Sequence, residues 1–141
     1  TEYRYQGKKV DAVLVDEAQF LSEAEIDTLS DLVDFYNIPV ICYGLRTDFR
    51  NRLFPGSRRL MEIADVIEEV PTVCWCGKRA QCNTRYANGE IVREGAQIML
   101  GSNESYVALC RKHYKEGKLW KEAGAENETS TRRNCKIMEK E

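Results

Sequence analysis

Two adjacent carboxylates, Asp16 and Glu17, follow a β-branched, nearly continuous apolar run at residues 10–15. In open parallel sheets, ligands bind beyond the carboxyl ends of the strands, and these acids stand at such an end. There an aspartate can hold Mg²⁺ on a triphosphate, while a neighbouring glutamate can polarise a water or hydroxyl nucleophile. The alternative is that both acids are solvated residues at the start of a loop.

A second group of residues has the types and spacing of a metal site. Cys74 and Cys76 form a C-x-C pair, and Cys110 and His113, separated from that pair by 33 residues, form a C-x-x-H pair. Three thiolates and one imidazole complete a tetrahedral set for structural zinc and leave no open position for a catalytic water. Because C-x-C is shorter than the usual C-x-x-C, Cys82 is a possible substitute ligand. The alternative is a set of buried reduced thiols with an ordinary surface histidine.

Cysteine and histidine usage also limits the class of protein. The chain has six cysteines, but intracellular thiols are normally reduced, so zinc is favoured over a disulfide framework. His113 is the only histidine, which excludes a catalytic triad built on histidine.

Several apolar side chains can line a slot for a planar ring, since small-ligand sites are mostly apolar with a few placed polar groups. These residues are Phe20, Leu45, Phe49, Phe54 and Tyr106. By pattern alone, core positions are the favoured interpretation. Arg46, Arg50 and Arg52 can meet phosphate, although solvated loop charges are favoured for at least two of them.

The acids require a sheet to position them, and the pattern predicts one. Residues 10–15 and 38–43 read as parallel strands buried on both faces. Between them, Ser22 opens an S-x-x-E capping box and predicts a helix of about 14 residues that ends at Asn37 and Pro39. Strand, helix and strand then form a right-handed crossover unit, and the fold class is α/β.

Further along the chain, residues 44–56 mix Gly, Pro, Arg and Phe without a period and suit a functional loop. Ser57 is expected to cap a second helix, and residues 66–70 are expected to form a third strand. The turn Asn88-Gly89 predicts a hairpin within a zinc-ribbon-like subdomain. The expected divisions are an α/β domain at 1–73, the zinc subdomain at 74–115 and a polar, disordered tail at 116–141.

Composition bounds the partners. With 141 residues, a net charge of -2 and a pI near 5.6, the chain suits one domain with a small appendage and has no general attraction for nucleic acid or an anionic membrane. No stretch approaches the roughly 20 apolar residues of a membrane span, and the polar start is no signal peptide. We therefore expect an intracellular protein without a nucleic-acid or membrane partner.

Phosphoryl transfer needs a phosphate cradle, normally G-x-x-x-x-G-K-[ST], and no such motif occurs in the sequence. The chain begins with Thr1 and enters a strand-like run within nine residues. We expect either that the cradle lies in a missing upstream part or that the acids do something else.

Four motifs in order, "VDEAQFL", "PVICYGLRTDFRNRLFPGS", "CWCGKRAQCNTR" and "GSNESYVALCRKHY", closely resemble the bacterial branch of the type II thymidine kinases. The resemblance covers about residues 8–115. It implies a P-loop α/β domain with a zinc-containing lasso subdomain. It also implies transfer of the γ-phosphate of ATP, with Mg²⁺, to the 5′-hydroxyl of thymidine.

The resemblance assigns roles by matching position. It implies that Glu17 is the catalytic base and that Asp16 belongs to the Mg²⁺ and phosphate site, within a nucleotide-contacting segment that includes Ala18 and Gln19. The implied zinc ligands are Cys74, Cys76, Cys110 and His113, and Cys82 then loses its claim. The implied thymidine-binding residues are Phe20, Leu45, Phe49, Phe54, Arg85, Gln97, Ile98, Met99, Leu100, Gly101 and Tyr106, with residues 97–101 bonding the base largely through the backbone.

Two family elements are absent from the sequence: the glycine-rich phosphate loop and an upstream acidic residue that assists Mg²⁺ binding. The chain therefore resembles the C-terminal two-thirds of such a kinase, and alone it is expected to be inactive. A homotetramer and a cytoplasmic location are expected from the resemblance. The alternative, from a different class, is a non-catalytic zinc-ribbon binding or scaffold module, which a true start codon just before Thr1 would support.

Overall fold

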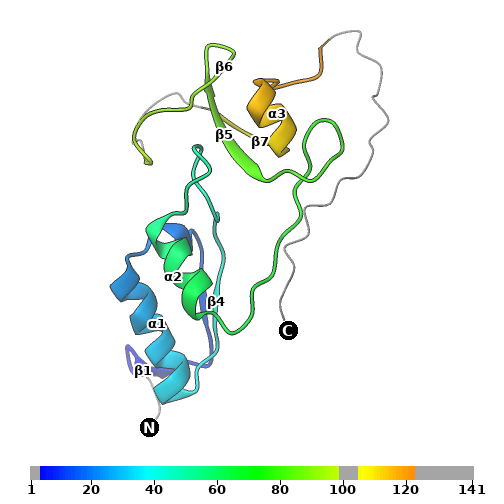
Figure 1. Ribbon diagram of the computed structural model, residues 1–141. Coiled ribbons are helices and arrows are strands. Elements are labelled where there is room, and N and C mark those ends of the chain that lie inside the picture. The colour runs from blue at the N-terminus through cyan, green and yellow to red at the C-terminus, as the bar shows by residue number, and fades with distance from the viewer. Residues whose placement is uncertain (1–3, 99–104, 123–141) are drawn as a thin grey trace.

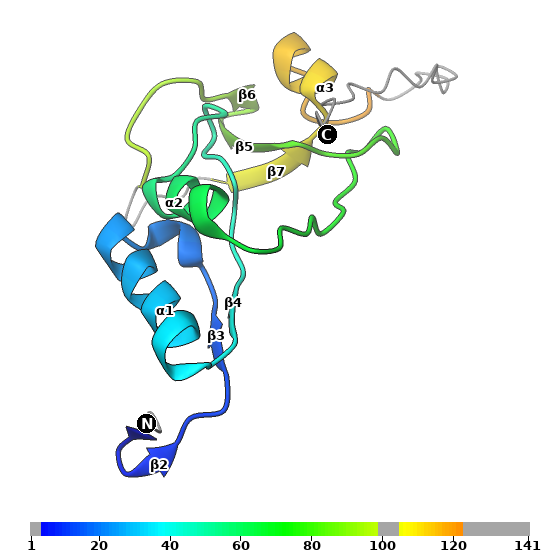
Figure 2. The same cartoon turned by 60° about the horizontal axis from the view of Figure 1, so that its bottom comes forward.

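The computed structural model describes residues 4–98 and 105–122. Figure 1 shows that the molecule has two parts, joined by an extended segment at 64–73. We call them the α/β part (residues 4–63) and, after the expected zinc ribbon, the ribbon part (residues 74–98 and 105–122). The same separation is visible after rotation (Figure 2). Loop 43–54 reaches from the α/β part to the ribbon part, where the Tyr114 hydroxyl donates a hydrogen bond to the Phe49 carbonyl at 3.0 Å.

The α/β part is built on one strand–helix–strand unit. Strands β3 (Val13–Val15) and β4 (Val40–Cys42) pair in parallel. Helix α1 (Glu23–Tyr36) connects them and has the 14 residues that the sequence predicts. It begins with the expected capping box at Ser22 and ends at Asn37, whose φ of 53° lies in the left-handed region. The predicted crossover between parallel strands is confirmed.

The prediction that both strands are buried on both faces is wrong for these residues. Leu14 in the middle of β3 is 69% exposed, and Ile41 opposite it is 49% exposed. The buried side chains lie on the side of α1, where Ile26 and Ile38 are almost inaccessible. Within the described residues, the sheet is therefore covered by its helix and open at Leu14 and Ile41.

Two further local predictions are also wrong. Residues 66–70 are extended but pair with no strand among residues 4–98 and 105–122, and Val66 and Val70 are mostly exposed. Helix α2 (Pro55–Ile63) starts before Ser57, with Phe54 at its N-cap. Proline is well suited to the first helical position because its missing N–H would have no helical partner there.

The ribbon part is an antiparallel sheet with one short helix. Strands β5 (Cys82–Ala87), β6 (Glu90–Ile91) and β7 (Ser105–Leu109) lie in the order β6-β5-β7, and helix α3 (Arg111–Glu116) follows. Asn88 and Gly89, both with positive φ, form the predicted hairpin turn between β5 and β6. The buried cluster of this part consists of Cys74, Ala80, Cys82, Leu109, Cys110, Tyr114 and Leu119.

This cluster extends past residue 115, the expected end of the zinc subdomain. Gly117, with a φ of 74°, ends α3 and turns the chain, and the Lys118 amide then donates to the His113 carbonyl at 3.0 Å. Leu119 consequently enters the core, and Trp120 packs edge-on against Tyr86. The packed structure thus continues to Trp120, and the rest of the predicted tail, from residue 123, lies outside the described residues.

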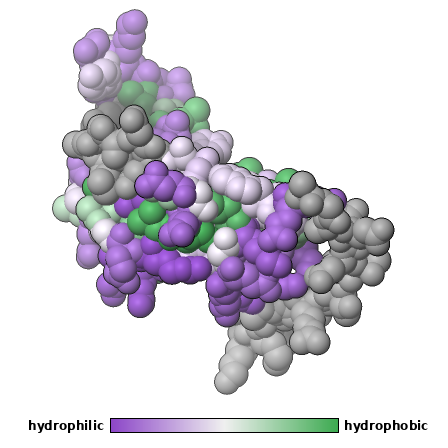
Figure 3. Space-filling view, turned by 90° about the horizontal axis from the view of Figure 1, so that it is seen from above, coloured by the Kyte–Doolittle hydropathy of each residue, from purple (hydrophilic) through white to green (hydrophobic). Residues whose placement is uncertain are grey.

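The remaining described elements are two short strands at the start of the chain. Strands β1 (Arg4–Tyr5) and β2 (Lys8–Lys9) form an exposed antiparallel hairpin. On the face of the molecule seen in Figure 3, hydrophilic residues border an apolar patch. In the part of the chain that the structure describes, no helix has the length and apolar character needed to cross a bilayer.

Candidate functional site

The two acids stand where β3 ends. Asp16 and Glu17 are exposed, and an Asp16 carboxylate oxygen accepts the Glu17 amide hydrogen at 2.8 Å. Glu17 itself adopts a left-handed conformation (φ 53°, ψ 36°) at the start of the 3₁₀ helix η1 (Ala18–Phe20). A non-glycine residue in this region costs of order 1–2 kcal/mol, and such strain concentrates at functional sites. The turn therefore holds two carboxylates together at the sheet edge at a local energetic cost.

Gln19 ties this turn to the chain that follows β4. Its side chain is 1% exposed, its amide nitrogen donates to the Glu17 carboxylate, and its amide oxygen accepts the Leu45 amide hydrogen at 3.1 Å. A Cβ atom at Gly44 would lie 2.5 Å from that oxygen, so the backbone approaches as closely as only glycine allows. Gln19 thus orients the Glu17 carboxylate and connects it to the backbone that follows β4.

Helix α2 supports the same turn from the other side. A Cβ atom at Gly56 would lie 2.5 Å from the Ala18 carbonyl oxygen and 2.6 Å from that of Leu21. The neighbouring Ser57 hydroxyl donates to the Leu45 carbonyl at 2.5 Å. Ser57, expected to cap the helix, instead joins it to the loop after β4.

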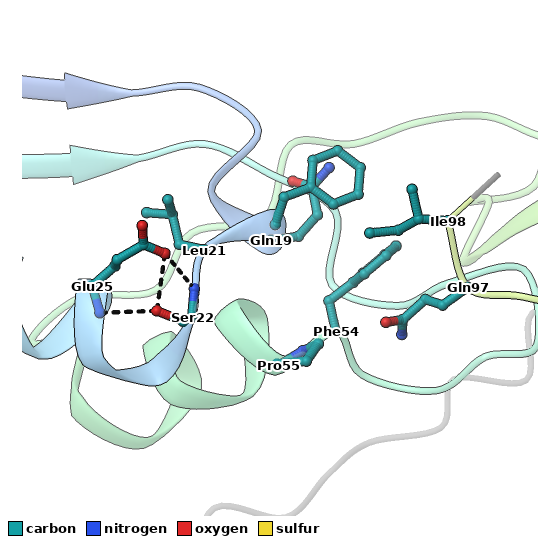
Figure 4. Close-up of a pocket in the computed structure, with 9 residues that line it drawn as sticks. Gln19, Leu21, Ser22, Glu25, Phe54, Pro55, Gln97 and Ile98 are labelled. Atoms are coloured by element: carbon teal, nitrogen blue, oxygen red, sulfur yellow. Dashed lines mark hydrogen bonds between the residues drawn. The ribbon is translucent and has the colours of Figure 1, made fainter. Parts of the chain in front are cut away.

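A cavity of about 280 Å³ opens beside η1, near the lower end of the range for small-ligand sites. The Phe20 and Phe54 rings meet edge to face at 5.6 Å between centroids. Figure 4 shows Phe54 and Ile98 directed toward the same space, with Gln19 to their left. The lining residues are Gln19, Phe20, Leu21, Ser22, Glu25, Phe54, Pro55, Gln97 and Ile98.

The cavity brings together four of the expected thymidine-binding residues, Phe20, Phe54, Gln97 and Ile98. It also includes four residues that sequence reasoning missed as cavity residues: Leu21, Ser22, Glu25 and Pro55. Ser22 and Glu25 carry a clear signal, the capping box, but that signal indicates a helix start and says nothing about a neighbouring cavity.

The other expected thymidine-binding residues are placed differently. Leu45 and Tyr106 are partly exposed, Phe49 is 1% exposed, and none of the three lines this cavity. Met99, Leu100 and Gly101 lie outside the described residues.

Arg85 in β5 is fully buried. Its guanidinium donates to the Tyr106 hydroxyl at 2.9 Å, the Ala96 carbonyl at 2.9 Å and the Gln97 carbonyl at 3.3 Å. The same group lies 3.8 Å above the centre of the Phe49 ring. Arg85 therefore holds the backbone that leads into the expected nucleoside-wrapping segment, and this geometry argues for an indirect role rather than a direct contact with a nucleoside.

Asp48 is the polar residue of the loop that sequence reasoning missed. Its carboxylate is buried and accepts the backbone amide hydrogens of Arg50 and Arg52 at 2.8 and 3.0 Å, and the Arg50 guanidinium at 2.9 Å. Burial opposes ionisation, but the hydrogen bonds from Arg52, Arg50 and Gln97 outweigh it and hold the pKa of Asp48 below its ordinary value. The available signal is the aspartate-turn pattern in "TDFRN", which many ordinary loops share.

The metal-ligand group comes together as the spacing predicts. The ligand atoms of Cys74, Cys76, Cys110 and His113 all lie within 4.8 Å of one another. The Cys74 sulfur is 3.4 Å from His113 Nδ1, and the Cys76 and Cys110 sulfurs are 4.0 Å apart. Cys82 lies in β5 and is not part of the group. This cluster can hold a metal ion, and three sulfurs with one imidazole suit zinc.

The groups of the cluster differ in how readily they reach the form that binds a metal ion. Burial, together with the nearby Cys74 and Cys76 thiolates, raises the pKa of Cys110 to about 11. Burial also opposes ionisation of Cys74, but hydrogen bonds from Cys76 and Cys110 lower its pKa. Burial lowers the pKa of His113 and keeps its imidazole neutral, as a ligand requires. A metal ion would neutralise the thiolates, which otherwise repel one another.

The Trp75 ring braces the histidine of this cluster. It stacks on His113 with 4.1 Å between ring centres and 6° between planes, and its ring N–H donates to the Lys118 carbonyl at 3.1 Å. The orientation of the imidazole is therefore determined by packing as well as by any metal.

The sequence model of the thymidine kinase family matches residues 1–114. Among curated proteins, a thymidine kinase of Haemophilus influenzae (strain ATCC 51907 / DSM 11121 / KW20 / Rd) is 54% identical over 110 residues, which are 77% of this chain and 57% of that protein. A thymidine kinase of Legionella pneumophila (strain Paris) is 50% identical over 85% of this chain and 58% of its own length. One from Pasteurella multocida (strain Pm70) is 51% identical over 79% of this chain and 58% of its own length.

The chain thus spans somewhat less than three fifths of the length of these relatives. Within that span lie the acidic turn, the cavity and the Cys₃His cluster described above. The family match covers most of the chain, and the identity is near one half over the same region, so the chain belongs to the thymidine kinase family.

Proposed function

We propose that the protein carrying this chain transfers the γ-phosphate of ATP to the 5′-hydroxyl of thymidine. The observation that carries the proposal is the position of Glu17, held by the buried Gln19 amide, next to a cavity walled by Phe20 and Phe54. Membership of the thymidine kinase family supports the choice of reaction.

In this proposal Glu17 accepts the proton of the 5′-hydroxyl as that oxygen attacks the phosphoryl group. The Gln19 amide aims the Glu17 carboxylate, and the close approach at Gly44 and Gly56 keeps the turn in place. Catalysis then rests on positioning and on electrostatic stabilisation of the transferred group.

Asp16 is the residue of this chain that would help to hold Mg²⁺ with ATP. The site fits the ion to this extent: Asp16 is an exposed carboxylate at the carboxyl end of a parallel strand, and Mg²⁺ prefers carboxylate oxygens with water and phosphate. The ion would neutralise developing charge on the phosphates. The 141 residues contain no G-x-x-x-x-G-K-[ST] motif. In this proposal, a part of the protein outside them supplies the P-loop.

The cavity suits the flat thymine ring, because Phe20, Phe54 and Ile98 offer apolar surface while Gln19 and Gln97 offer polar atoms. We assign zinc in the Cys₃His cluster a structural role, since four protein ligands leave no open position. A cytoplasmic location and a homotetramer complete the proposal, and both rest on the family resemblance.

The substitution Glu17→Gln tests the assignment of the base. In the protein expressed from its complete reading frame, kcat for thymidine phosphorylation should fall by about 10²- to 10⁴-fold, because the amide cannot take the proton. Thymidine binding, measured by calorimetry, should change less than about threefold. Glu23→Gln, the same change at an exposed position in the first turn of α1, is the control. Near-normal turnover of Glu17→Gln would overturn the role of Glu17.

The alternative, a non-catalytic zinc-ribbon binding or scaffold module, is decided by the same assay. If the wild-type protein from its complete reading frame binds zinc but phosphorylates no thymidine with ATP and Mg²⁺, the scaffold hypothesis is favoured over the kinase.

A further inference from the structure

The segment at 93–98, which leads into the expected nucleoside-wrapping residues, has little backbone pairing of its own. It follows β6 and belongs to no strand, and the described backbone contact nearest to it is the Val92 amide bonded to the Arg85 carbonyl at 2.9 Å. Its position therefore depends on side chains. At its start, its own Arg93 donates to the Tyr114 carbonyl at 2.6 Å, and beyond that point side chains reach it from other elements.

Two buried charged side chains from different elements reach this segment. Arg85, in the ribbon part, binds the carbonyl oxygens of Ala96 and Gln97. Asp48, in the loop of the α/β part, accepts a hydrogen bond from the Gln97 side-chain amide at 3.1 Å. Phe49, next to Asp48, lies directly beneath the Arg85 guanidinium. Side chains from both parts of the molecule therefore hold the segment, and we call these contacts of Arg85 and Asp48 the clasp.

The chemistry of this clasp is strong because its acceptor is a buried charge. Hydrogen bonds to ionised groups are about twice as strong as neutral ones, and a buried carboxylate that loses a donor pays a desolvation cost. The backbone amides of Arg50 and Arg52 hold Asp48 in one rotamer, so the carboxylate presents a fixed acceptor to Gln97.

We propose that Asp48 is a positioning residue, which through Gln97 holds segment 93–98 against the cavity and thereby sets how tightly the nucleoside is bound. Asp48 does not line the cavity, whereas Gln97 and Ile98 do. This inference rests on the proposed function and deepens it. The Asp48–Gln97 contact would set the position of this cavity wall, while the reacting acids at Asp16 and Glu17 would be untouched.

The test uses a reversed pair in the protein expressed from its complete reading frame. Gln97→Glu sets two carboxylates against each other and should raise KM for thymidine about tenfold, with kcat within about threefold of wild type. Asp48→Asn should raise KM similarly. The double variant Asp48→Asn/Gln97→Glu places an amide donor opposite a carboxylate acceptor, while the Arg50 guanidinium loses its carboxylate partner. Its KM should therefore lie well below the product of the two single effects without reaching the wild-type value.

Gln81→Glu is the matched control, because it makes the same change at an exposed position of the ribbon part. Its KM should equal that of the wild type. A simple sum of the two losses in the double variant would overturn the proposal, as would an unchanged KM in Gln97→Glu.

Limited proteolysis provides a readout that does not depend on activity. In Gln97→Glu, tryptic cleavage after Arg93 should accelerate about tenfold while the zinc content stays at the wild-type value. An unchanged cleavage rate would overturn the clasp even if the kinase assay succeeds. If the wild type phosphorylates no thymidine, the proposed function fails, and the cleavage rate still decides whether Asp48 holds the segment. Because Gln97 is only half-buried, Gln97→Glu also serves if Asp48→Asn fails to fold.

Discussion

The α/β part and the ribbon part are held together by different means. The ribbon part has one contiguous buried cluster of seven residues, and two of them, Cys74 and Cys110, also belong to the group that can hold a metal ion. In the α/β part, the parallel strands β3 and β4 are three residues long, and apolar residues such as Leu14 and Ile41 face outward. Its buried positions gather around Ile26, Ile38 and the turn after β3.

The two parts therefore have different roles: the ribbon part is structural, and the acidic turn of the α/β part carries the candidate reacting groups. In the ribbon part, a group of four side chains that can hold a metal ion and a small core gather around one point. The acidic turn has no comparable metal-ligand group and depends on Gln19, Gly44 and Gly56 to keep its strained backbone in place. The Asp48–Gln97 contact connects the two parts, so the position of the nucleoside segment depends on both.

The largest expected effect is loss of the metal from the ribbon part. Chelation, or the substitution Cys110→Ser, should remove stabilisation on the order of 10 kcal/mol and unfold this part. The Trp75 near-ultraviolet circular dichroism signal should disappear and proteolysis within residues 74–115 should accelerate, while the helical signal of α1 persists.

Cys82→Ser is the control for that experiment, because Cys82 is buried in the same core but lies outside the ligand group. It should retain one zinc ion per chain. Metal analysis that finds no zinc in freshly purified wild-type protein would refute the zinc assignment.

A smaller effect is expected from truncation in the α/β part. Ile26→Ala removes a side chain of α1 that is 1% exposed and should lower the free energy of unfolding by about 2–4 kcal/mol, as measured by urea denaturation. Ile67→Ala, at a position 57% exposed, should cost less than about 0.5 kcal/mol. The zinc content should stay constant in both variants. Equal losses at the two positions would contradict the description of where this core lies.

The smallest effect concerns the helix start beside the cavity. Ser22→Ala removes the hydroxyl that accepts the Glu25 amide hydrogen and should destabilise the protein by about 1 kcal/mol, seen as a lower midpoint of urea unfolding. Ser22→Thr keeps the hydroxyl and should restore most of that loss. A midpoint in Ser22→Ala equal to that of the wild type would show that α1 does not depend on its cap.

Local signals account for what could be predicted. The capping box at Ser22 acts within one helical turn, and Asn88-Gly89 acts within one hairpin, so both elements follow from a few neighbouring residues. The predicted strand at 66–70 fails for the opposite reason. Its residues have strand-like composition, but a strand needs a partner, and the described chain places none beside it.

In the candidate site, too, some features follow from signals in the sequence and others depend on distant partners. Residue types and spacing alone indicated the Cys₃His cluster and the acids after a parallel strand, because metal-ligand chemistry and sheet topology both leave a mark in the sequence. Residue types named the aromatic side chains as possible lining of an apolar slot, and the family resemblance favoured that interpretation over core positions. Phe20 and Phe54 line the cavity, and Phe49 does not. Asp48 was missed because a turn-forming aspartate resembles any other in sequence.

The sequence by itself determined the strand–helix–strand unit, the ligand set and the two acids at the strand end, since each depends on contacts between near neighbours or on a fixed spacing. Only the tertiary structure decided that Arg85 turns inward onto Phe49 and that Asp48 meets Gln97, 49 residues away. A buried charge finds its partners through the packing of whole elements, and the number of polar residues that can serve as partners is too large for sequence to select one.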